Sequence, residues 1–228
     1  MATFNLETPD AFGDLYLASD YQEAEEFSHR PIFTGDVIRR NDDSFVALLQ
    51  HPCAMRRGVN LAPKLLVAQV VPFPHMPSDW SHSHFKRMFL PRTEGSSYAI
   101  NFDDIEVLPR VEIEQGVRFL IMSELGVNTL LQRWLHHNSR VIVPTVTLHE
   151  VTTGPFDEAD LVGEAVADLV ERDMDPITAL ALADTWLSGR HTEDGQIRRE
   201  LLAIPQSRGV IRGAMRRYIK EEVDKIPA

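Results

Sequence analysis

Short apolar segments alternate with turn-forming residues along the first half of the chain. Residues 32–39 and 44–50 flank the turn Asn41-Asp42-Asp43, a pattern typical of a β-hairpin. A further apolar run over 64–71 stops at Pro72, because proline cannot donate a hydrogen bond to a neighbouring strand. The same criteria predict shorter strands at 85–90, 98–102 and 105–109. Short strands with little helix between them predict a small SH3-like barrel or a bent antiparallel β-barrel.

Helical periodicity replaces this pattern near residue 112. The predicted helices lie at 115–125, 128–137, 157–175, 176–187, 196–203 and 207–225. Residues 141–148 are β-rich but contain a proline, so we expect an edge strand or an extended connector that ends at Gly154-Pro155. At the start of the chain, residues 9–27 mix acidic and apolar positions and predict a short acidic helix that caps the core or docks on a partner.

These patterns predict an α+β protein with a helical C-terminal region. We divide it into an acidic N-terminal segment at 1–29, a β-barrel domain at 30–110 and a helical domain at 111–228, because the composition changes near residue 111. A length of 228 residues, with 43% apolar and 25% charged residues, fits a folded globular chain. No apolar run is long enough to span a bilayer, and the N-terminus has no basic signal-peptide region. We therefore expect a cytoplasmic protein with no membrane partner.

Charge is distributed unevenly, although the net charge of -11 argues against indiscriminate binding of nucleic acid. Residues 51–100 contain a cluster of cations that we call the basic island, made up of Arg56, Arg57, Lys86, Arg87 and Arg92. Aromatic residues such as Trp80 and Phe85 are interleaved with it. Cations that bind phosphates beside aromatic rings that stack on bases are typical of proteins that bind single-stranded nucleic acid. The alternative is that the rings belong to the core and the cations are merely solvated.

The last predicted helix carries four cations on one face, with a spacing of four residues. They are Arg208, Arg212, Arg216 and Lys220. This face suits nucleic acid or an acidic protein partner. It equally suits the acidic predicted helix at 157–175, which would neutralise it within the chain.

Between residues 51 and 84, five residues have side chains of the type that bind zinc: His51, Cys53, His75, His82 and His84. The candidate ligands are His51, Cys53, His82 and His84. Their spacing matches no established zinc motif, so we favour no metal and expect no cofactor. Cys53 lies close to His51 and two arginines and is also a candidate nucleophile, against the simpler alternative of a small buried side chain. It is the single cysteine, so no internal disulfide can form. The chain lacks the glycine-rich signatures of Rossmann, P-loop and α/β-hydrolase enzymes.

Residues 30–75 resemble the opening of the PemK/MazF-type toxins. The resemblance rests on Gly35-Asp36-Val37, the hairpin, the basic loop and residues 65–72. It implies a small SH3-like barrel, metal-independent cleavage of RNA and inhibition by an acidic partner segment. Two motifs depart from the family pattern. Arg30-Pro31 precedes Gly35 rather than leading into the second strand, and Gln50-His51-Pro52-Cys53 stands where the family has serine or threonine.

The function that we expect is a non-enzymatic binding or regulatory module of a bacterial-type cytoplasmic system, of the toxin–antitoxin or defence kind. Its basic island would contact nucleic acid or an acidic protein partner. The alternative is a metal-independent endoribonuclease in which Arg56 or Arg57 stabilises the phosphorane and His51 or His84 is the general acid or base. A further alternative is a structural subunit of a protein complex, and self-association is compatible with all three.

Overall fold

The computed structural model describes residues 5–82, 84–92, 95–192 and 195–224. It is an α+β protein in which a curled antiparallel sheet forms half a barrel and is followed by C-terminal helices, which confirms the predicted fold class. The strands of the sheet are β1 (Tyr16–Ala18), β2 (Val37–Arg39), β3 (Phe45–Leu48), β6 (Lys64–Pro72), β7 (Arg87–Leu90), β8 (Tyr98–Pro109) and β9 (Val117–Met122). They are arranged in the order β1-β9-β2-β3-β6-β8-β7.

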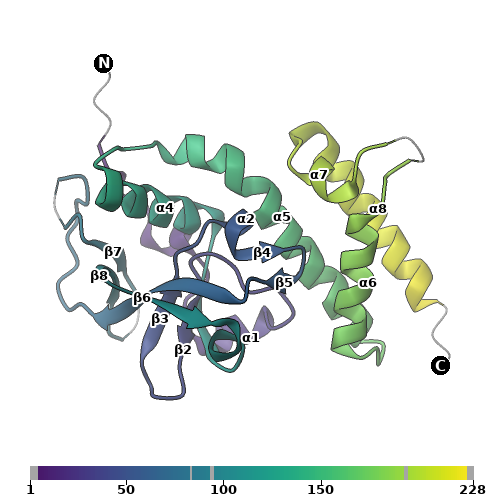
Figure 1. Ribbon diagram of the computed structural model, residues 1–228, viewed down its shortest axis with the longest axis horizontal. Coiled ribbons are helices and arrows are strands. Elements are labelled where there is room, and N and C mark those ends of the chain that lie inside the picture. The colour runs from purple at the N-terminus through teal and green to yellow at the C-terminus, as the bar shows by residue number, and fades with distance from the viewer. Residues whose placement is uncertain (1–4, 83, 93–94, 193–194, 225–228) are drawn as a thin grey trace.

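The remaining elements surround this sheet. A small separate hairpin pairs β4 (Arg56–Arg57) with β5 (Asn60–Leu61). The helices are η1 (Phe12–Leu15), α1 (Tyr21–Glu26), α2 (Pro52–Met55), α3 (Arg110–Glu114), α4 (Glu124–Ser139), α5 (Thr145–Val170), α6 (Pro176–Ser188), α7 (Arg198–Leu202) and α8 (Pro205–Val223). Figure 1 shows the sheet beside α4 and α5, with α6, α7 and α8 on the other side of the molecule. None of the helices in the described residues is long and apolar enough to cross a membrane.

The predicted hairpin is present as β2 and β3, with Val37 opposite Ala47. Its turn includes Asp43 at a φ of 65°, a left-handed conformation that aspartate tolerates better than most residues. The long apolar run is β6, as predicted. The two short strands expected at 98–102 and 105–109 are one strand, β8, whose register against β6 shifts between Ala68 and Val70.

The helix predicted at 115–125 is wrong, because these residues contain β9. This strand lies between β1 and β2, where Leu120 pairs with Val37. Its residues Phe119 to Met122 are all buried, and a short apolar run of this kind does not distinguish a strand from a helix by its periodicity. The position between β1 and β2, where this segment pairs on both sides, decides the outcome.

The expected extended stretch at 141–148 is correct only as far as Pro144, after which α5 begins at Thr145. Gly154-Pro155 lies inside this helix instead of ending it. A Cβ atom at Gly154 would come within 2.9 Å of the Cα atom of Ala203, so the glycine permits the close packing of α7 on α5. Likewise, the single helix expected at 9–27 is replaced by η1, β1 and α1.

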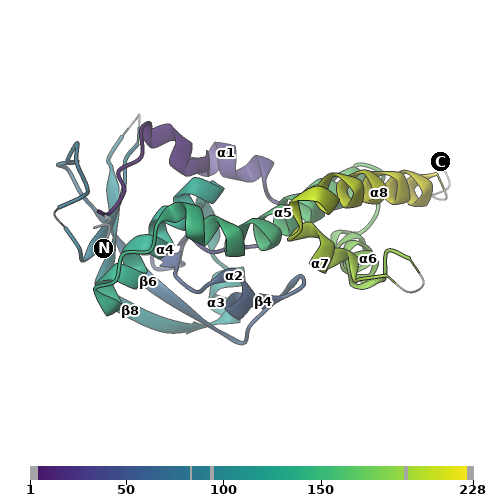
Figure 2. The ribbon, with the colours of Figure 1, turned by 90° about the horizontal axis from the view of Figure 1, so that it is seen from above.

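Two hydrophobic cores share helix α5. The first core lies under the sheet and includes Phe156 and Ala159, whereas the second begins at Leu161 and Val162 and lies among α5, α6, α7 and α8. Figure 2 shows α8 alongside the C-terminal half of α5. The boundary between the cores therefore falls within α5 and does not coincide with the boundary that composition suggested near residue 111.

Candidate functional site

A cleft of about 630 Å³ lies where the region around α2 and β4 faces α5 and α7. Its lining includes both polar and apolar side chains: His51, Pro52, Cys53, Arg56, Arg57, Gly58, Glu150, Val151, Gly154, Pro155, Glu158, Arg199 and Ala203. In Figure 1, α2 lies beside α5 near the centre of the molecule, and the β4–β5 hairpin follows it. Two residues of the basic island thus share one cleft with His51 and Cys53.

Helix α2 positions Cys53 at this cleft. His51 caps the helix, since its Nδ1 atom accepts a hydrogen bond of 3.3 Å from the backbone N–H of Cys53. Pro52 occupies the first turn, where its missing N–H costs no helical hydrogen bond. Met55 is fully buried and anchors the turn, while Cys53 is exposed. The alternative in which Cys53 is a small buried group is therefore excluded.

Arg56 is the most buried cation of the cleft, with a relative exposure of 9%. Its Nε atom donates to the carbonyl of Gly58 at 2.7 Å, and Nη2 lies 3.6 Å from Glu158 Oε1. Neither Nη1 nor Nη2 has a hydrogen-bond acceptor among the described residues. Burial lowers the pKa of Arg56 to about 10, although the carboxylate of Glu158 opposes this shift. Its neighbour Arg57 is exposed and lines the same cleft.

A chain of charges connects Arg56 to the helices. Glu158 on α5 accepts a hydrogen bond of 3.0 Å from Arg199 Nε on α7, and Arg199 Nη2 donates to Asp184 on α6 at 2.6 Å. The backbone N–H of Val59 completes the chain by donating to the same Asp184 oxygen at 3.2 Å. The tip of the β4–β5 hairpin is thereby attached to the helices that pack around the second core.

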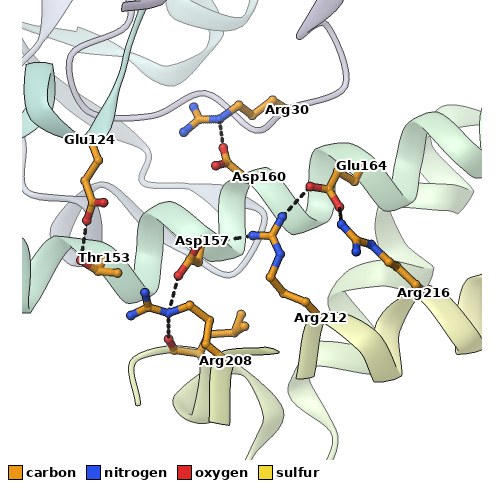
Figure 3. A network of polar contacts seen from close by, with 10 residues as sticks. Arg30, Glu124, Thr153, Asp157, Asp160, Glu164, Arg208, Arg212 and Arg216 are labelled. Atoms are coloured by element: carbon orange, nitrogen blue, oxygen red, sulfur yellow. Dashed lines mark hydrogen bonds and ion pairs between the residues drawn. The ribbon is translucent and has the colours of Figure 1, made fainter. Parts of the chain in front are cut away.

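A second group of charges is buried beneath the sheet and involves Asp36 of the Gly-Asp-Val motif. Asp36 Oδ2 accepts from the backbone N–H of Phe33 at 3.0 Å and lies 3.4 Å from Arg118 Nε. Burial raises the pKa of Asp36, and the positive charges of Arg118 and Arg30 oppose that shift. Arg30 in turn pairs with Asp160 on α5 at 2.6 Å (Figure 3). In this chain, Asp36 is thus part of the interior and does not line the cleft.

The other three cations of the basic island are not among the residues that line the cleft. Lys86 and Arg87 lie at the start of the edge strand β7, whereas Arg92 reaches Phe119 on β9. Lys86 pairs with Asp103 at 2.6 Å, and the guanidinium groups of Arg87 and Arg92 lie over the rings of Phe73 and Phe119. Trp80 is fully buried, with Arg133 over its ring. The structure therefore does not gather the predicted cations and aromatic rings into one surface.

The residues of zinc-binding type also remain apart. His51 caps α2, whereas the ring of His84 lies 5.2 Å from that of Phe89. His82 is exposed. Within the described part of the chain, no group of three His, Cys, Asp or Glu side chains is arranged to hold a metal ion.

Three of the four cations on the last helix pair with α5 (Figure 3). Arg208 and Arg212 contact Asp157 at 2.5 and 3.3 Å, and Arg212 and Arg216 contact Glu164 at 2.5 and 3.0 Å. Lys220 is exposed. The acidic side of α5 thus neutralises most of this face within the chain, which leaves Lys220 as its exposed cation without a pair to α5 among the described contacts.

Glu150, Glu158 and Arg199 also line the cleft, but the sequence patterns did not predict them as site residues. Glu158 is one of many acidic residues in its helix, and Arg199 is one of many basic residues near the C-terminus. No local pattern distinguishes them from solvated charges. Only the buried position of Glu158, between two arginines from distant segments, shows its role.

Comparison with known proteins adds no family assignment. No family model matches the chain. The search of curated proteins likewise found no significant match. The resemblance of residues 30–75 to the PemK/MazF-type toxins therefore stays a hypothesis, and the geometry of the cleft is the main basis for a functional proposal.

Proposed function

We propose that the protein is a non-enzymatic binding module whose cleft holds an acidic segment of a protein partner. One observation carries this proposal: Arg56 and Arg199 already share the carboxylate of Glu158 in the wall of the cleft. These arginines thus bind a carboxylate of the chain itself, which supports a carboxylate as the group that an incoming partner presents. Glu158 and the carbonyl of Gly58 hold Arg56 in the wall, and Arg57 is exposed at the same cleft.

The walls of the cleft favour a peptide over a single strand of nucleic acid. Val151, Pro155 and Ala203 supply apolar surface in the same cleft as the arginines. A single strand would need aromatic rings on which its bases stack, but the residues that line the cleft include no Phe, Tyr or Trp. A net charge of -11 also disfavours a polyanion as long as a nucleic acid. An acidic peptide with apolar side chains would contact both the arginines and the apolar residues of the cleft.

The test is fluorescence anisotropy with a labelled peptide of alternating glutamate and leucine, compared with its glutamine counterpart. We expect the glutamate peptide to bind more tightly and to lose affinity as salt increases, since exposed charge pairs are screened. Arg57→Ala should weaken binding by about two- to fivefold, the range for one exposed ion pair. Arg56→Lys keeps the buried charge but loses the planar fork of donors, and it should also weaken binding.

Lys86→Ala is the matched control, because it removes the same charge from the β7 edge. Equal weakening by Arg57→Ala and Lys86→Ala would contradict the proposal. So would tighter binding of labelled single-stranded RNA or DNA than of the peptide, which would restore the nucleic-acid hypothesis. Lack of any binding at low salt would overturn the proposal in favour of a structural subunit, whose self-association light scattering would then measure.

The endoribonuclease is the second candidate, and one observation favours it. His51, Arg56 and Arg57 line the same cleft, as cleavage of RNA without a metal would need, whereas His84 is not among its lining residues. A denaturing gel of RNA incubated with the protein and with Arg57→Ala tests this candidate. Cleavage by the first and not by the second would support the enzyme, and an intact probe supports the binding module.

The cellular setting that we propose is a bacterial-type cytoplasmic system of the toxin–antitoxin or defence kind. It rests on the resemblance of residues 30–75 and on the acidic partner that the cleft favours. Co-purification from a bacterial lysate, with wild type against Arg57→Ala as bait, tests this setting. An acidic protein captured by the wild type alone would support it.

A further inference from the structure

Strand β8 has a stretch of edge without a neighbouring strand. One side of β8 pairs with β6 over most of its length, whereas on the other side β7 pairs only with residues 98–101. No further strand of the described residues pairs with β8 on that side. We call residues 103–109 the open edge. Ile105 and Val107 lie on it, and they are 45% and 57% exposed.

The backbone of Val107 points toward the open edge. Val107 lies opposite Leu66 of β6. The N–H of Leu66 donates to the Gln50 side chain at 3.0 Å, and its C=O accepts from the N–H of Leu49 at 3.0 Å. Both partners follow β3, on the far side of β6 from β8. Because the two residues of such an antiparallel pair both turn their backbone groups outward, the N–H and C=O of Val107 face away from β6. Ile105, two positions earlier, repeats this orientation.

The open edge therefore presents backbone donors and acceptors together with apolar side chains. The N–H and C=O groups of Ile105 and Val107 have no backbone partner among the described residues. The two side chains lie on one face of the strand, since they are two positions apart. Pro109 ends the stretch because it has no N–H. Free backbone groups on an exposed strand are a template for one more strand.

The charges of the open edge favour a cationic occupant. Asp104 is exposed and has no ion pair or hydrogen bond among the described residues. A second copy of this chain, paired antiparallel in a register centred on Ile105, would place Asp104 opposite Glu106. A register centred on Glu106 would place that carboxylate opposite its own copy. Like charges directly opposite each other destabilise a sheet, so these acids disfavour self-pairing and attract a basic segment.

We propose that the open edge binds an extended segment of a partner protein in which lysine or arginine alternates with branched apolar residues. The segment adds to the sheet as a strand beside β8. Its backbone pairs with that of Ile105 and Val107, its apolar side chains cover these two residues, and a cation lies near Asp104. None of the three lines the cleft, so the inference does not rest on the proposed function.

The first experiment uses a labelled peptide of alternating lysine and valine in fluorescence anisotropy. Its two counterparts are a lysine–proline peptide, which has the same charge but lacks donors at alternate positions, and a glutamate–valine peptide. We expect the lysine–valine peptide to bind more tightly than both. Hydrogen exchange then locates the site: the amides of Ile105 and Val107 should exchange about tenfold more slowly when the free peptide is at about ten times its Kd.

Two variants test the contacts one at a time. Val107→Pro removes the N–H that faces the open edge and no hydrogen bond to β6, so it should weaken binding by about two- to tenfold. Asp104→Asn should weaken binding by about two- to fivefold and reduce its salt dependence. The matched control is Asp168→Asn, an exposed aspartate on α5, which should leave the affinity unchanged.

Three results would overturn the inference. The lysine–proline peptide could bind as tightly as the lysine–valine peptide, Asp104→Asn and Asp168→Asn could weaken binding equally, or the peptide could bind without protecting Ile105 and Val107. Where Val107→Pro fails to fold, the exchange measurement on the wild type decides. A dimer in light scattering that Asp104→Asn strengthens would assign the open edge to a second copy, against the proposal. Arg57→Ala should weaken binding of the glutamate–leucine peptide alone, which separates the two surfaces.

Discussion

The backbone N–H of Val59 donates a hydrogen bond of 3.2 Å to the carboxylate of Asp184, which lies 125 residues further along the chain. Val59 is at the tip of the β4–β5 hairpin, and Asp184 is on α6. The same carboxylate oxygen accepts from Arg199. One side chain thus fixes the hairpin that carries Arg56 and Arg57 to the helices on the other side of the cleft.

Asp184→Ala should release this hairpin. The substitution removes one hydrogen bond and one ion pair, both partly exposed, so we expect a loss of about 1–2 kcal/mol in the free energy of unfolding. Denaturant titration measures the loss, and faster hydrogen exchange at Val59 locates it. Asp168→Ala, an exposed aspartate of α5, is the control and should stay within about 0.5 kcal/mol of the wild type. Equal effects of the two substitutions would contradict the role of Asp184.

Gly58→Ala should weaken the contact between the hairpin and Asp184 through two effects, backbone strain and a steric clash, which can be measured separately. Gly58 has a φ of +59°, and a Cβ atom there would come within 2.3 Å of Asp184 Oδ1. Gly95 has a φ of +75°, but among the described residues apart from its chain neighbours the nearest atom to its added Cβ is 3.9 Å away. Gly95→Ala therefore measures the backbone cost alone, about 1 kcal/mol. We expect Gly58→Ala to lower stability by more than this, and an equal loss in the two variants would show that Asp184 moves aside freely.

Acid should weaken α2 through His51. Burial lowers the pKa of His51, and only its neutral ring can accept the hydrogen bond from Cys53. Because the folded state disfavours the proton, the contribution of His51 is fully present above its unfolded pKa of about 6.5 and is lost as pH falls through the lower folded pKa. Unfolding titrations at about pH 8 and about pH 5 measure the loss.

His51→Asn is the control for this pH effect, since asparagine keeps a capping acceptor and does not titrate. The difference in stability between the two pH values should be smaller for His51→Asn than for the wild type. An identical difference in both proteins would assign the acid sensitivity to other groups.

Arg212→Ala should loosen α8, because this arginine links Asp157 and Glu164 on α5. The pairs are partly exposed, so we expect about 1 kcal/mol of destabilisation at low salt and less at high salt. Thermal unfolding at two salt concentrations measures both quantities. Arg217→Ala, at an exposed position of the same helix, should cost less. A salt-independent loss for Arg212→Ala would point to lost packing of its side chain and not to its charge.

Some of the fold could be predicted from the sequence because local chemistry fixes it. The hairpin of β2 and β3, strand β6 and the start of α6 at Asp175-Pro176 follow from apolar runs, turn residues and helix caps that act within a few positions. The cations of α8 were predicted to share one face because they are spaced four residues apart. Their pairing with the acidic helix, seen here as α5, was one of the two alternatives that this prediction offered.

The tertiary structure alone decided the rest. Residues 117–122 are a strand because β1 and β2 flank them, and α5 continues through Gly154-Pro155 because α7 packs closely there. The cleft depends on the same kind of long-range contact: Glu158 and Arg199 meet Arg56 only after the hairpin docks on the helices. Local preferences of the chain span a few residues, whereas burial of a charge depends on partners more than a hundred positions away. For that reason the sequence identified Arg56 and Arg57 as candidates, and only the fold showed that one is buried beside a carboxylate and the other is exposed.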